Sequence, residues 1–393
     1  MNNFVYNTPT KVVFGKGTEE KAGELVRNYG GHRVLLHYGG GSAERSGLLE
    51  RVRQSLQKNN LPWVELGGVV PNPRLSKIHE GIALGRQEQV DFILAVGGGS
   101  VIDSAKAIGY GLASEGEVWD FFEKKHKPVK SIPVGAILTI AAAGSEMSSS
   151  CVVTREEGWL KRGCTSELSR PRFAIMNPEL TLNLSPWQTA CGCVDIMMHT
   201  MERYFHRSGG MELTDGFAEA LLKTVMKNAL ALRDNPSSYE ARAEIMWAGA
   251  LSHNGLTGCG TDGGDWAAHK IEHELSGLYD VSHGAGLAAV WGSWARYVCH
   301  ADMARFARFA VKVMDVEENG TEEELALRGI EAMEEFFRAI HMPVSLRELG
   351  VYPAEEDILS MAEKCYAGMG GPVGVVLPLQ IDDIASIYRM AKG

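Results

Sequence analysis

The 393-residue sequence predicts an α/β domain followed by an all-α domain. In residues 1–182, short β-branched runs alternate with helical stretches, and the apolar run 91–96 is typical of a parallel strand that is covered on both faces. In residues 183–393, apolar residues recur every three or four positions and strand-like alternation nearly disappears. We therefore expect two domains, with their boundary between residues 182 and 183.

The expected elements follow from these patterns in chain order. Short apolar runs predict strands at 11–14, 33–38, 63–66 and 91–96, and the segments between them predict helices at 19–28, 46–59 and 75–88. A capping-box pattern with proline at the first helical position begins the first helix of the second half at Ser185–Gln188. Periodic segments then predict helices at 186–206, 213–233, 238–253, 264–278, 286–315, 321–340 and 354–367.

Composition excludes several classes of protein. Hydrophobic residues make up 45% and charged residues 22% of the chain, which argues against intrinsic disorder. A net charge of −10 has the wrong sign for a diffuse binder of nucleic acid or anionic membrane, and no apolar run approaches the ~18 residues of a spanning helix. The N-terminus lacks a basic, apolar secretory signal, and seven cysteines without a C-x-x-C pair argue against a disulfide framework. We expect a soluble, cytoplasmic protein with no nucleic-acid or membrane partner.

Glycine clusters follow two of the predicted strands. Gly97-Gly98-Gly99 ends one strand and begins a helix that carries Asp103 and Lys106. Free backbone N–H groups at such a helix start bind phosphate, and glycine lets the ligand approach closely. The segment matches neither the G-x-G-x-x-G fingerprint nor the P-loop, so a plain turn is the alternative.

The loop at 39–42 has the same setting after the strand at 33–38. NAD-specific sites usually place an acidic side chain near such a strand end, to bind the ribose 2′-hydroxyl. This loop offers only glycines and Ser42, with Arg45 nearby, which favours NADP(H) over NAD(H). Glu44 argues the other way, and a solvated loop is the alternative.

Acidic and histidine residues recur at helical spacing in the second half. Asp195 and His199 lie four residues apart and therefore share one helix face. His269 and His273 share a face of a second helix in the same way, and His283 follows in a turn region. One carboxylate with several imidazoles suits Fe²⁺ or Zn²⁺.

Two other classes of function compete with this interpretation. Residues 269–273 read H-x-x-E-H, which in inverted zinc peptidases supplies two metal ligands and a catalytic glutamate. That hypothesis leaves the glycine loops unexplained. A non-catalytic sensor of nucleotide or metal is the other alternative.

Taken together, the motifs resemble those of a known family over essentially the whole chain. They are the strings at 7–10, 14–17, 71–73, 97–106, 144–147, 195–199, 265–269 and 283–284. In this combination they are similar to the iron-containing (group III) alcohol dehydrogenases, most closely the NADPH-dependent butanol dehydrogenase and aldehyde reductase branch. A polyol dehydrogenase or a dehydroquinate-synthase-like lyase of the same superfamily is the nearest rival.

The resemblance implies a Rossmann-like N-terminal domain, a helical metal-binding domain and a set of site residues. The implied metal ligands are Asp195, His199, His269 and His283, and His273 matches a position of proton relay. The implied cofactor residues are Gly39, Gly40 and Ser42 at the adenosine ribose with Asn72 nearby, Gly98, Gly99, Ser100 and Asp103 at the pyrophosphate, and Thr139, Lys161 and Leu180 toward the nicotinamide.

The activity that the resemblance implies is hydride transfer between NADP(H) and a small primary alcohol or aldehyde such as butanol or butanal. A divalent ion would polarise the substrate oxygen, and the protein would form a homodimer. One segment departs from the family pattern Thr-x-Pro-x-Thr-Gly-Ser-Glu, because residues 139–146 lack the proline and carry Ala143 in place of the second threonine. Near the expected ligands, we interpret Cys191, Cys193, Met197 and Met198 as core residues.

Overall fold

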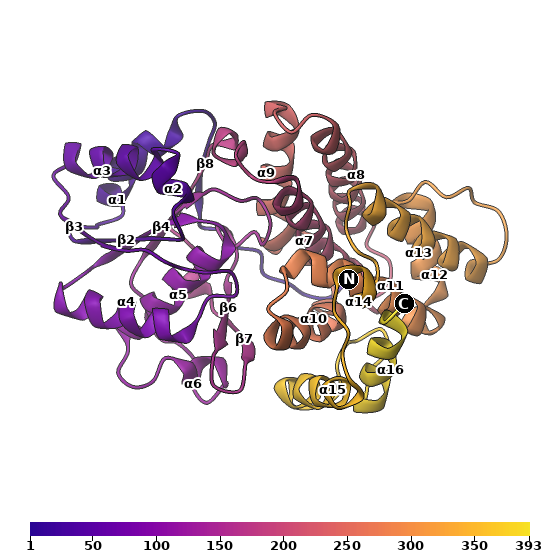
Figure 1. Ribbon diagram of the computed structural model, residues 1–393. Coiled ribbons are helices and arrows are strands. Elements are labelled where there is room, and N and C mark those ends of the chain that lie inside the picture. The colour runs from indigo at the N-terminus through magenta and orange to yellow at the C-terminus, as the bar shows by residue number, and fades with distance from the viewer. The chain divides into compact units, whose positions relative to one another are not determined.

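The structure is a computed structural model that describes residues 1–393 and divides into two compact units (Figure 1). One unit comprises Asn7–Asn183 and the other comprises Met1–Tyr6 with Leu184–Gly393. The first is α/β and the second is helical, so the predicted fold class is confirmed. The first six residues belong to the helical unit, where the Asn2 N–H donates to the Gly260 carbonyl at 2.9 Å; the sequence analysis had grouped them with the α/β domain.

A six-stranded parallel sheet forms the centre of the α/β unit. Its strand order is β1-β8-β5-β4-β2-β3, and every neighbouring pair runs parallel. The strands are β1 (Lys11–Phe14), β2 (Val34–Tyr38), β3 (Trp63–Leu66), β4 (Phe92–Gly97), β5 (Val134–Leu138) and β8 (Phe173–Met176). All residues of β4, β5 and β8 are buried, as the continuous apolar runs require of strands covered on both faces.

Helices connect the strands of this unit. They are η1 (Thr18–Lys21), α1 (Ala22–Asn28), α2 (Ser42–Arg45), α3 (Leu48–Lys58), α4 (Leu75–Gln87), α5 (Gly99–Ala113), α6 (Trp119–Phe122), η2 (Glu167–Ser169) and η3 (Pro178–Thr181). The strands predicted at 11–14 and 63–66 have those bounds, and the other two differ by one residue at one or both ends. The predicted helix at 19–28 begins instead with the 3-10 turn η1, and the helix predicted at 46–59 begins after Gly47, whose φ is +71°.

An antiparallel hairpin lies outside the main sheet. It pairs β6 (Ser150–Arg155) with β7 (Leu160–Thr165), and the sequence analysis did not identify it. A four-residue Glu-Glu-Gly-Trp turn joins the two strands, and Gly158 has a φ of +78°, a conformation that glycine adopts readily.

The second unit is built from helices alone apart from one isolated bridge. They are α7 (Pro186–Tyr204), α8 (Glu212–Asp234), α9 (Tyr239–His253), η4 (Leu256–Gly258), α10 (Ala267–Tyr279), α11 (His283–Val298), η5 (Cys299–Ala301), α12 (Met303–Lys312), α13 (Glu322–Ala339), α14 (Leu346–Leu349), α15 (Glu355–Met369) and α16 (Ile381–Ala391). The predicted capping box is confirmed, because Ser185 Oγ accepts from the Gln188 N–H and Gln188 Oε1 accepts from the Ser185 N–H.

One predicted helix of this unit is wrong in extent. The periodic segment 286–315 forms two helices, α11 and α12, which are separated at residues 299–302. The Asp302 side chain accepts a hydrogen bond from the Arg305 N–H at 3.2 Å and thereby begins α12 as a new helix. The apolar spacing continues across this break, so periodicity alone could not reveal it.

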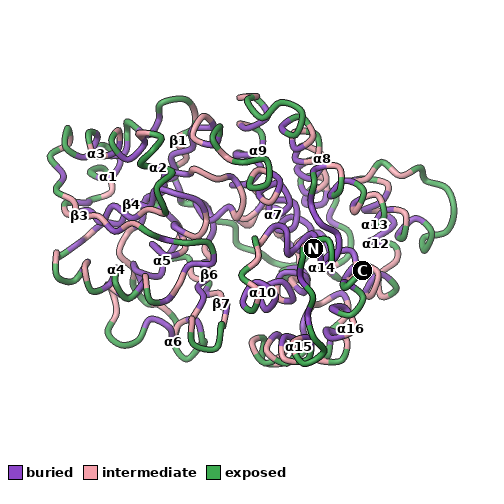
Figure 2. Tube along the Cα trace, in the orientation of Figure 1, coloured by how far each residue is buried: buried purple, intermediate pink, exposed green.

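Aromatic side chains fill the core of the helical unit. Phe205 at the end of α7 stacks on Phe306 with ring centroids 4.4 Å apart, and it meets the edge of Trp294 at 5.7 Å. Figure 2 shows buried residues along β4 and α7 and exposed residues in the outer loops of each unit. None of the helices combines the length and the apolar composition that crossing a lipid bilayer requires.

Candidate functional site

The two glycine loops emerge at the same edge of the parallel sheet. Tyr38 at the end of β2 pairs in register with Val96 of β4, so the segments beginning at Gly39 and Gly97 leave the sheet side by side. Gly98 caps α5 in extended conformation, and the first-turn N–H groups of α5 are directed toward this edge. A dinucleotide binds at the carboxyl edge of such a sheet, next to a helix N-terminus.

Glycine is required at position 99 for a close approach. A Cβ atom there would lie 2.8 Å from the Ala143 Cβ, which is closer than carbon atoms pack. The start of α5 therefore touches the segment 139–146, and the Thr139 N–H donates to the Gly97 carbonyl at 3.0 Å. The departure from the family pattern at Ala143 thus lies directly against the glycine segment at the start of α5.

A buried polar network fixes the following segment to α5. Asp103 accepts hydrogen bonds from the Ser145 hydroxyl at 2.5 Å and from the Val152 N–H at 2.9 Å. One turn later the fully buried Lys106 ammonium donates to Ser145 Oγ and to the Ser150 carbonyl, each at 2.8 Å. Asp103, which the resemblance assigned to the pyrophosphate, therefore has both carboxylate oxygens hydrogen-bonded inside this unit.

The other expected cofactor residues are spread over several elements of the α/β unit. Ser42 is the first residue of α2, and Asn72 is buried in a left-handed conformation with φ of +54°. Lys161 is buried on β7, whereas Leu180 in η3 packs against the apolar core formed with α1 and α3. The structure thus groups the residues of loops 39–42, 97–100 and 139, and η3 with Leu180 follows β8, whose carboxyl end lies at the same edge of the sheet.

The loop expected near the adenosine ribose carries an ion-pair network that the sequence analysis missed. Arg53 on α3 binds the Glu44 carboxylate with two hydrogen bonds of 2.9 and 3.0 Å, and it binds Glu65 at 2.8 Å. The hydrogen bonds from Arg53 lower the pKa of Glu65 to about 2. The Arg45 guanidinium folds back over the loop and lies so close to Gly41 that a Cβ atom there would be 2.5 Å from Arg45 Nη1. Glu44, whose charge argued against NADP(H), is thus held by an arginine.

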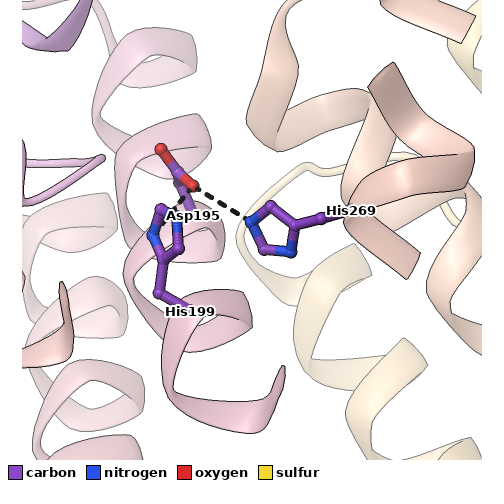
Figure 3. Close-up of side chains that lie close together, drawn as sticks. All are labelled: Asp195, His199 and His269. Atoms are coloured by element: carbon purple, nitrogen blue, oxygen red, sulfur yellow. Dashed lines mark ion pairs between the residues drawn. The ribbon is translucent and has the colours of Figure 1, made fainter. Parts of the chain in front are cut away.

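Three helices of the other unit bring the four expected metal ligands together. Asp195 and His199 lie on α7, His269 lies on α10 and His283 begins α11. Figure 3 shows the His199 and His269 rings turned toward the Asp195 carboxylate. The Asp195 Oδ1 atom lies 3.3 Å from His199 Nδ1, 4.0 Å from His269 Nε2 and 3.7 Å from His283 Nε2.

The donor atoms of this cluster fit a divalent metal ion. His199 Nδ1 and His269 Nε2 are buried and make no hydrogen bond. Burial lowers the pKa of both imidazoles well below the usual range, so both are neutral at pH 7 and present lone pairs. Three imidazoles and one carboxylate are a ligand set typical of Fe²⁺ or Zn²⁺.

His273 lies beside this cluster. It follows His269 by one turn of α10, is buried, and its ring centroid is 5.7 Å from that of His283. Its side chain is thus within reach of the cluster. A role in proton relay stays a prediction.

Three further side chains surround the cluster: sequence analysis did not identify Glu202 or His253, and it considered Glu272 only as the base of the peptidase hypothesis. Glu202 on α7 and Glu272 on α10 are buried carboxylates that contact His269 and His283, respectively. Burial raises the pKa of Glu202 to about 7. His253 at the end of α9 packs against His199 with the rings tilted and their centroids 4.0 Å apart. The spacing of Glu202, three residues after His199, was a usable signal, because it places both on one helix face.

Two glycines allow the helices of this site to approach closely. A Cβ atom at Gly284 would lie 2.1 Å from the Cys191 carbonyl oxygen, so the start of α11 packs directly on α7. A Cβ atom at Gly264 would lie 2.2 Å from the Glu202 carbonyl oxygen, and its φ of +85° is itself suited to glycine. Cys193, Met197 and Met198 are buried core residues of α7, as expected, and Cys191 is partly buried.

The first unit has a Rossmann-like sheet with glycine loops at its carboxyl edge, and the second has an Asp–His cluster. This combination is typical of a nucleotide-dependent metalloenzyme built from two units. The sequence matches the family model of iron-containing alcohol dehydrogenase over residues 9–178. It also matches the model of the Fe-containing alcohol dehydrogenase family, C-terminal, over residues 189–392. The chain belongs to the iron-containing alcohol dehydrogenase family and is an NAD(P)-dependent alcohol dehydrogenase.

Individual relatives cover nearly the whole chain. NADH-dependent butanol dehydrogenase A of Clostridium acetobutylicum is 38% identical over 390 residues, which are 99% of each chain. The NADPH-dependent aldehyde reductase YqhD of Escherichia coli is 34% identical over 354 residues, which are 89% of this chain and 90% of the reductase. The crystal structure of NADH-dependent butanol dehydrogenase A from Thermotoga maritima matches with a TM-score of 0.96 and 40% identity, covering 100% of this chain and 99% of that one.

Proposed function

We propose that this alcohol dehydrogenase interconverts small primary alcohols and aldehydes, such as butanol and butanal, with NADP(H) as the preferred cofactor. The observation that carries the proposal is the convergence of His199, His269 and His283 on the Asp195 carboxylate, within a chain that matches the family from end to end. The family also accounts for the glycine loops, which the peptidase hypothesis left unexplained.

Asp195, His199, His269 and His283 would hold the metal ion. A bound Fe²⁺ or Zn²⁺ would supply Lewis acidity toward the substrate oxygen. With a single carboxylate among the four ligands, a bound dication would keep net positive charge, and the burial of His199 and His269 keeps their imidazoles neutral. Burial of the cluster also keeps bulk water away from these nitrogens and strengthens electrostatic interactions there.

His273 would move the proton that accompanies hydride transfer. Oxidation of an alcohol sends a hydride to the nicotinamide and releases one proton, and reduction of an aldehyde takes up both. A histidine imidazole exchanges protons in the physiological pH range. The position of His273 beside His283, but one turn beyond His269, supports a relay role over a ligand role.

The surroundings of the loop at 39–42 support NADP(H). The loop carries no carboxylate, Arg45 folds over it, and Glu44 accepts two hydrogen bonds from Arg53. A 2′-phosphate carries about two negative charges, so a nearby cation favours it and a free carboxylate would repel it. Among the relatives, the two butanol dehydrogenases are named for NADH and the aldehyde reductase for NADPH, so cofactor choice needs a direct measurement.

A steady-state screen tests this proposal. The purified protein is loaded with Fe²⁺ or Zn²⁺ and assayed with straight-chain aldehydes and alcohols of increasing length, with glycerol and 1,2-propanediol as polyol controls, using NADPH and NADH in parallel. We expect metal-dependent turnover of butanal with a higher kcat/KM for NADPH. A higher kcat/KM for the polyols would support the polyol-dehydrogenase rival, and a preference for NADH would refute the cofactor assignment. Cofactor binding without turnover of any substrate would indicate a sensor.

Two further predictions from the sequence, a homodimer and a cytoplasmic location, remain proposals. Light scattering coupled to size-exclusion chromatography measures the first directly. A mass near twice the 42.8 kDa of the chain is the expected result.

A further inference from the structure

We infer that Glu202 and Glu272 are positioning residues of the metal site, each holding one ligand histidine by its Nδ1 atom so that Nε2 faces the ion. The inference rests on the ligand set of the proposed function and adds two buried carboxylates to it. It also gives a role to the glutamate of the H-x-x-E-H segment, which the peptidase hypothesis had interpreted as a catalytic base.

Glu202 fixes His269 through both its side chain and its backbone. The Glu202 Oε1 atom lies 2.7 Å from His269 Nδ1, and it accepts a second hydrogen bond from the His269 N–H at 2.9 Å. When Glu202 is ionised, its carboxylate only accepts hydrogen bonds, so the imidazole proton resides on Nδ1. The Nε2 atom of His269, which makes no hydrogen bond, then presents its lone pair toward Asp195.

Glu272 holds His283 in the same way. Its side chain is fully buried, and one carboxylate oxygen contacts His283 Nδ1 while the other accepts a hydrogen bond from the Ser276 hydroxyl. The His283 Nε2 atom is directed to the other side of the ring, 3.7 Å from Asp195 Oδ1. Both carboxylates therefore lie behind a ligand ring, opposite the atom that would bind the metal.

These two contacts join the three ligand helices in sequence. Glu202 extends from α7 to His269 on α10, and Glu272 extends from α10 to His283 on α11. The two later ligand helices, α10 and α11, are thus each tied to the preceding ligand helix by a buried acid. His199 differs, because its ring packs against His253 and Trp266, with centroids 4.0 and 6.1 Å away.

The energetic consequence is stronger metal binding. A carboxylate that accepts the Nδ1 proton fixes the tautomer and ring orientation and makes Nε2 a better donor. Loss of such a contact weakens metal binding by about 10- to 100-fold in comparable sites. Glutamine is a suitable replacement, because it keeps the size of the side chain but lacks the charge and can present an NH₂ group that favours the wrong tautomer.

The test compares E202Q and E272Q with the parent protein. The affinity of the metal-free proteins for Zn²⁺ is measured by competition with a chromophoric chelator, and thermal melting checks that each variant is folded. We expect each variant to bind Zn²⁺ 10- to 100-fold more weakly. E334Q is the matched control, because Glu334 pairs with Arg296 on α11, the helix that carries His283, and contacts no ligand. Its affinity is expected to stay within twofold of the parent.

A second readout does not depend on bound metal. In ¹⁵N-histidine-labelled, metal-free protein, the nitrogen shifts report which ring nitrogen carries the proton, and we expect the Nδ1–H signals of His269 and His283 to change in E202Q and E272Q, respectively. If a glutamine variant does not fold, aspartate at the same position takes its place, since it retains the charge but reaches less far. Affinities within twofold of the parent, with unchanged tautomers, would overturn the inference. Metal-dependent turnover of the parent would then leave the proposed function intact.

Discussion

The contact between α11 and α7 makes Gly284→Ala a quantitative test of how the metal site is assembled. The added Cβ atom would lie 2.1 Å from the Cys191 carbonyl oxygen, whereas ordinary contacts begin at 3.4 Å. The two helices must therefore separate locally by about 1.3 Å. Because this oxygen belongs to the backbone of α7, no side-chain rotation can relieve the clash.

The expected cost follows from overpacking. Inserting a methyl group into a packed interior costs about 1–3 kcal/mol. For a unit of this size, each kcal/mol lowers the melting temperature by roughly 2–4 °C, so we expect the helical unit to melt about 2–12 °C earlier. His283 is the residue before Gly284, so the shift also moves its imidazole relative to Asp195, and metal affinity should fall by at least tenfold.

Calorimetry of the metal-free protein and chelator competition measure the two effects separately. Gly216→Ala in α8 is the control, because a Cβ atom at Gly216 meets no other atom within 4 Å and alanine favours helix by about 1 kcal/mol. If Gly284→Ala melts with the parent and binds Zn²⁺ equally well, the tight approach of α11 to α7 is not what positions His283.

Four further predictions address the ligands, the proton relay, the cofactor loop and acid stability. His283→Ala should abolish both stoichiometric metal and turnover, measured by elemental analysis and assay; activity in metal-free buffer would contradict its role as a ligand. His273→Ala should lower kcat or shift its pH profile while the metal content stays at that of the parent, so loss of metal would instead make His273 a ligand. Gly39→Asp should raise the KM for NADPH at least tenfold more than that for NADH, through repulsion of the 2′-phosphate, and an unchanged ratio would argue against this loop as the ribose site. Finally, although burial alone would raise it, the hydrogen bonds from Arg305 hold the pKa of Asp215 well below its usual range. Because its folded-state pKa is lowered, ionised Asp215 stabilises the protein at pH values above the unfolded pKa near 3.9, and this stabilisation is lost as the pH falls below 3.9. Asp215→Asn should therefore make the melting temperature fall less steeply as the pH is lowered. Equal slopes for the variant and the parent would contradict this prediction.

Local sequence patterns were sufficient to predict most helices and strands, because the burial of one or both faces of an element requires apolar residues at a regular spacing. The apolar run of β4 and the four-residue spacing of Asp195 and His199 follow directly from strands covered on both faces and from helix periodicity. The break before α12 was missed because the hydrogen bond of Asp302 competes with helix continuation without interrupting the apolar spacing. The assignment of Met1–Tyr6 was missed because a pairing such as Asn2 with Gly260 has no local signature.

The candidate site, too, could be predicted from the sequence only in part. Spacing could place His269 and His273 on one helix face, but it could not show that His269 meets Glu202 from a segment 67 residues earlier. It also could not show that Asp103 is hydrogen-bonded to Ser145 and Val152, since both partners lie beyond the helix that carries it. Contacts that are distant in sequence depend on the packing of whole helices, which composition and periodicity do not encode.

The separation of the ligands along the chain has a consequence for biogenesis. A ribosome that has completed α7 has produced Asp195 and His199, but His283 is translated 84 residues after His199. Until α10 and α11 have folded against α7, the nascent polypeptide offers an ion only one carboxylate and one imidazole, a weak pair of donors. Iron or zinc would therefore be captured only after α10 and α11 have been translated, and the metal supply at that moment would decide which ion the proposed ligands bind.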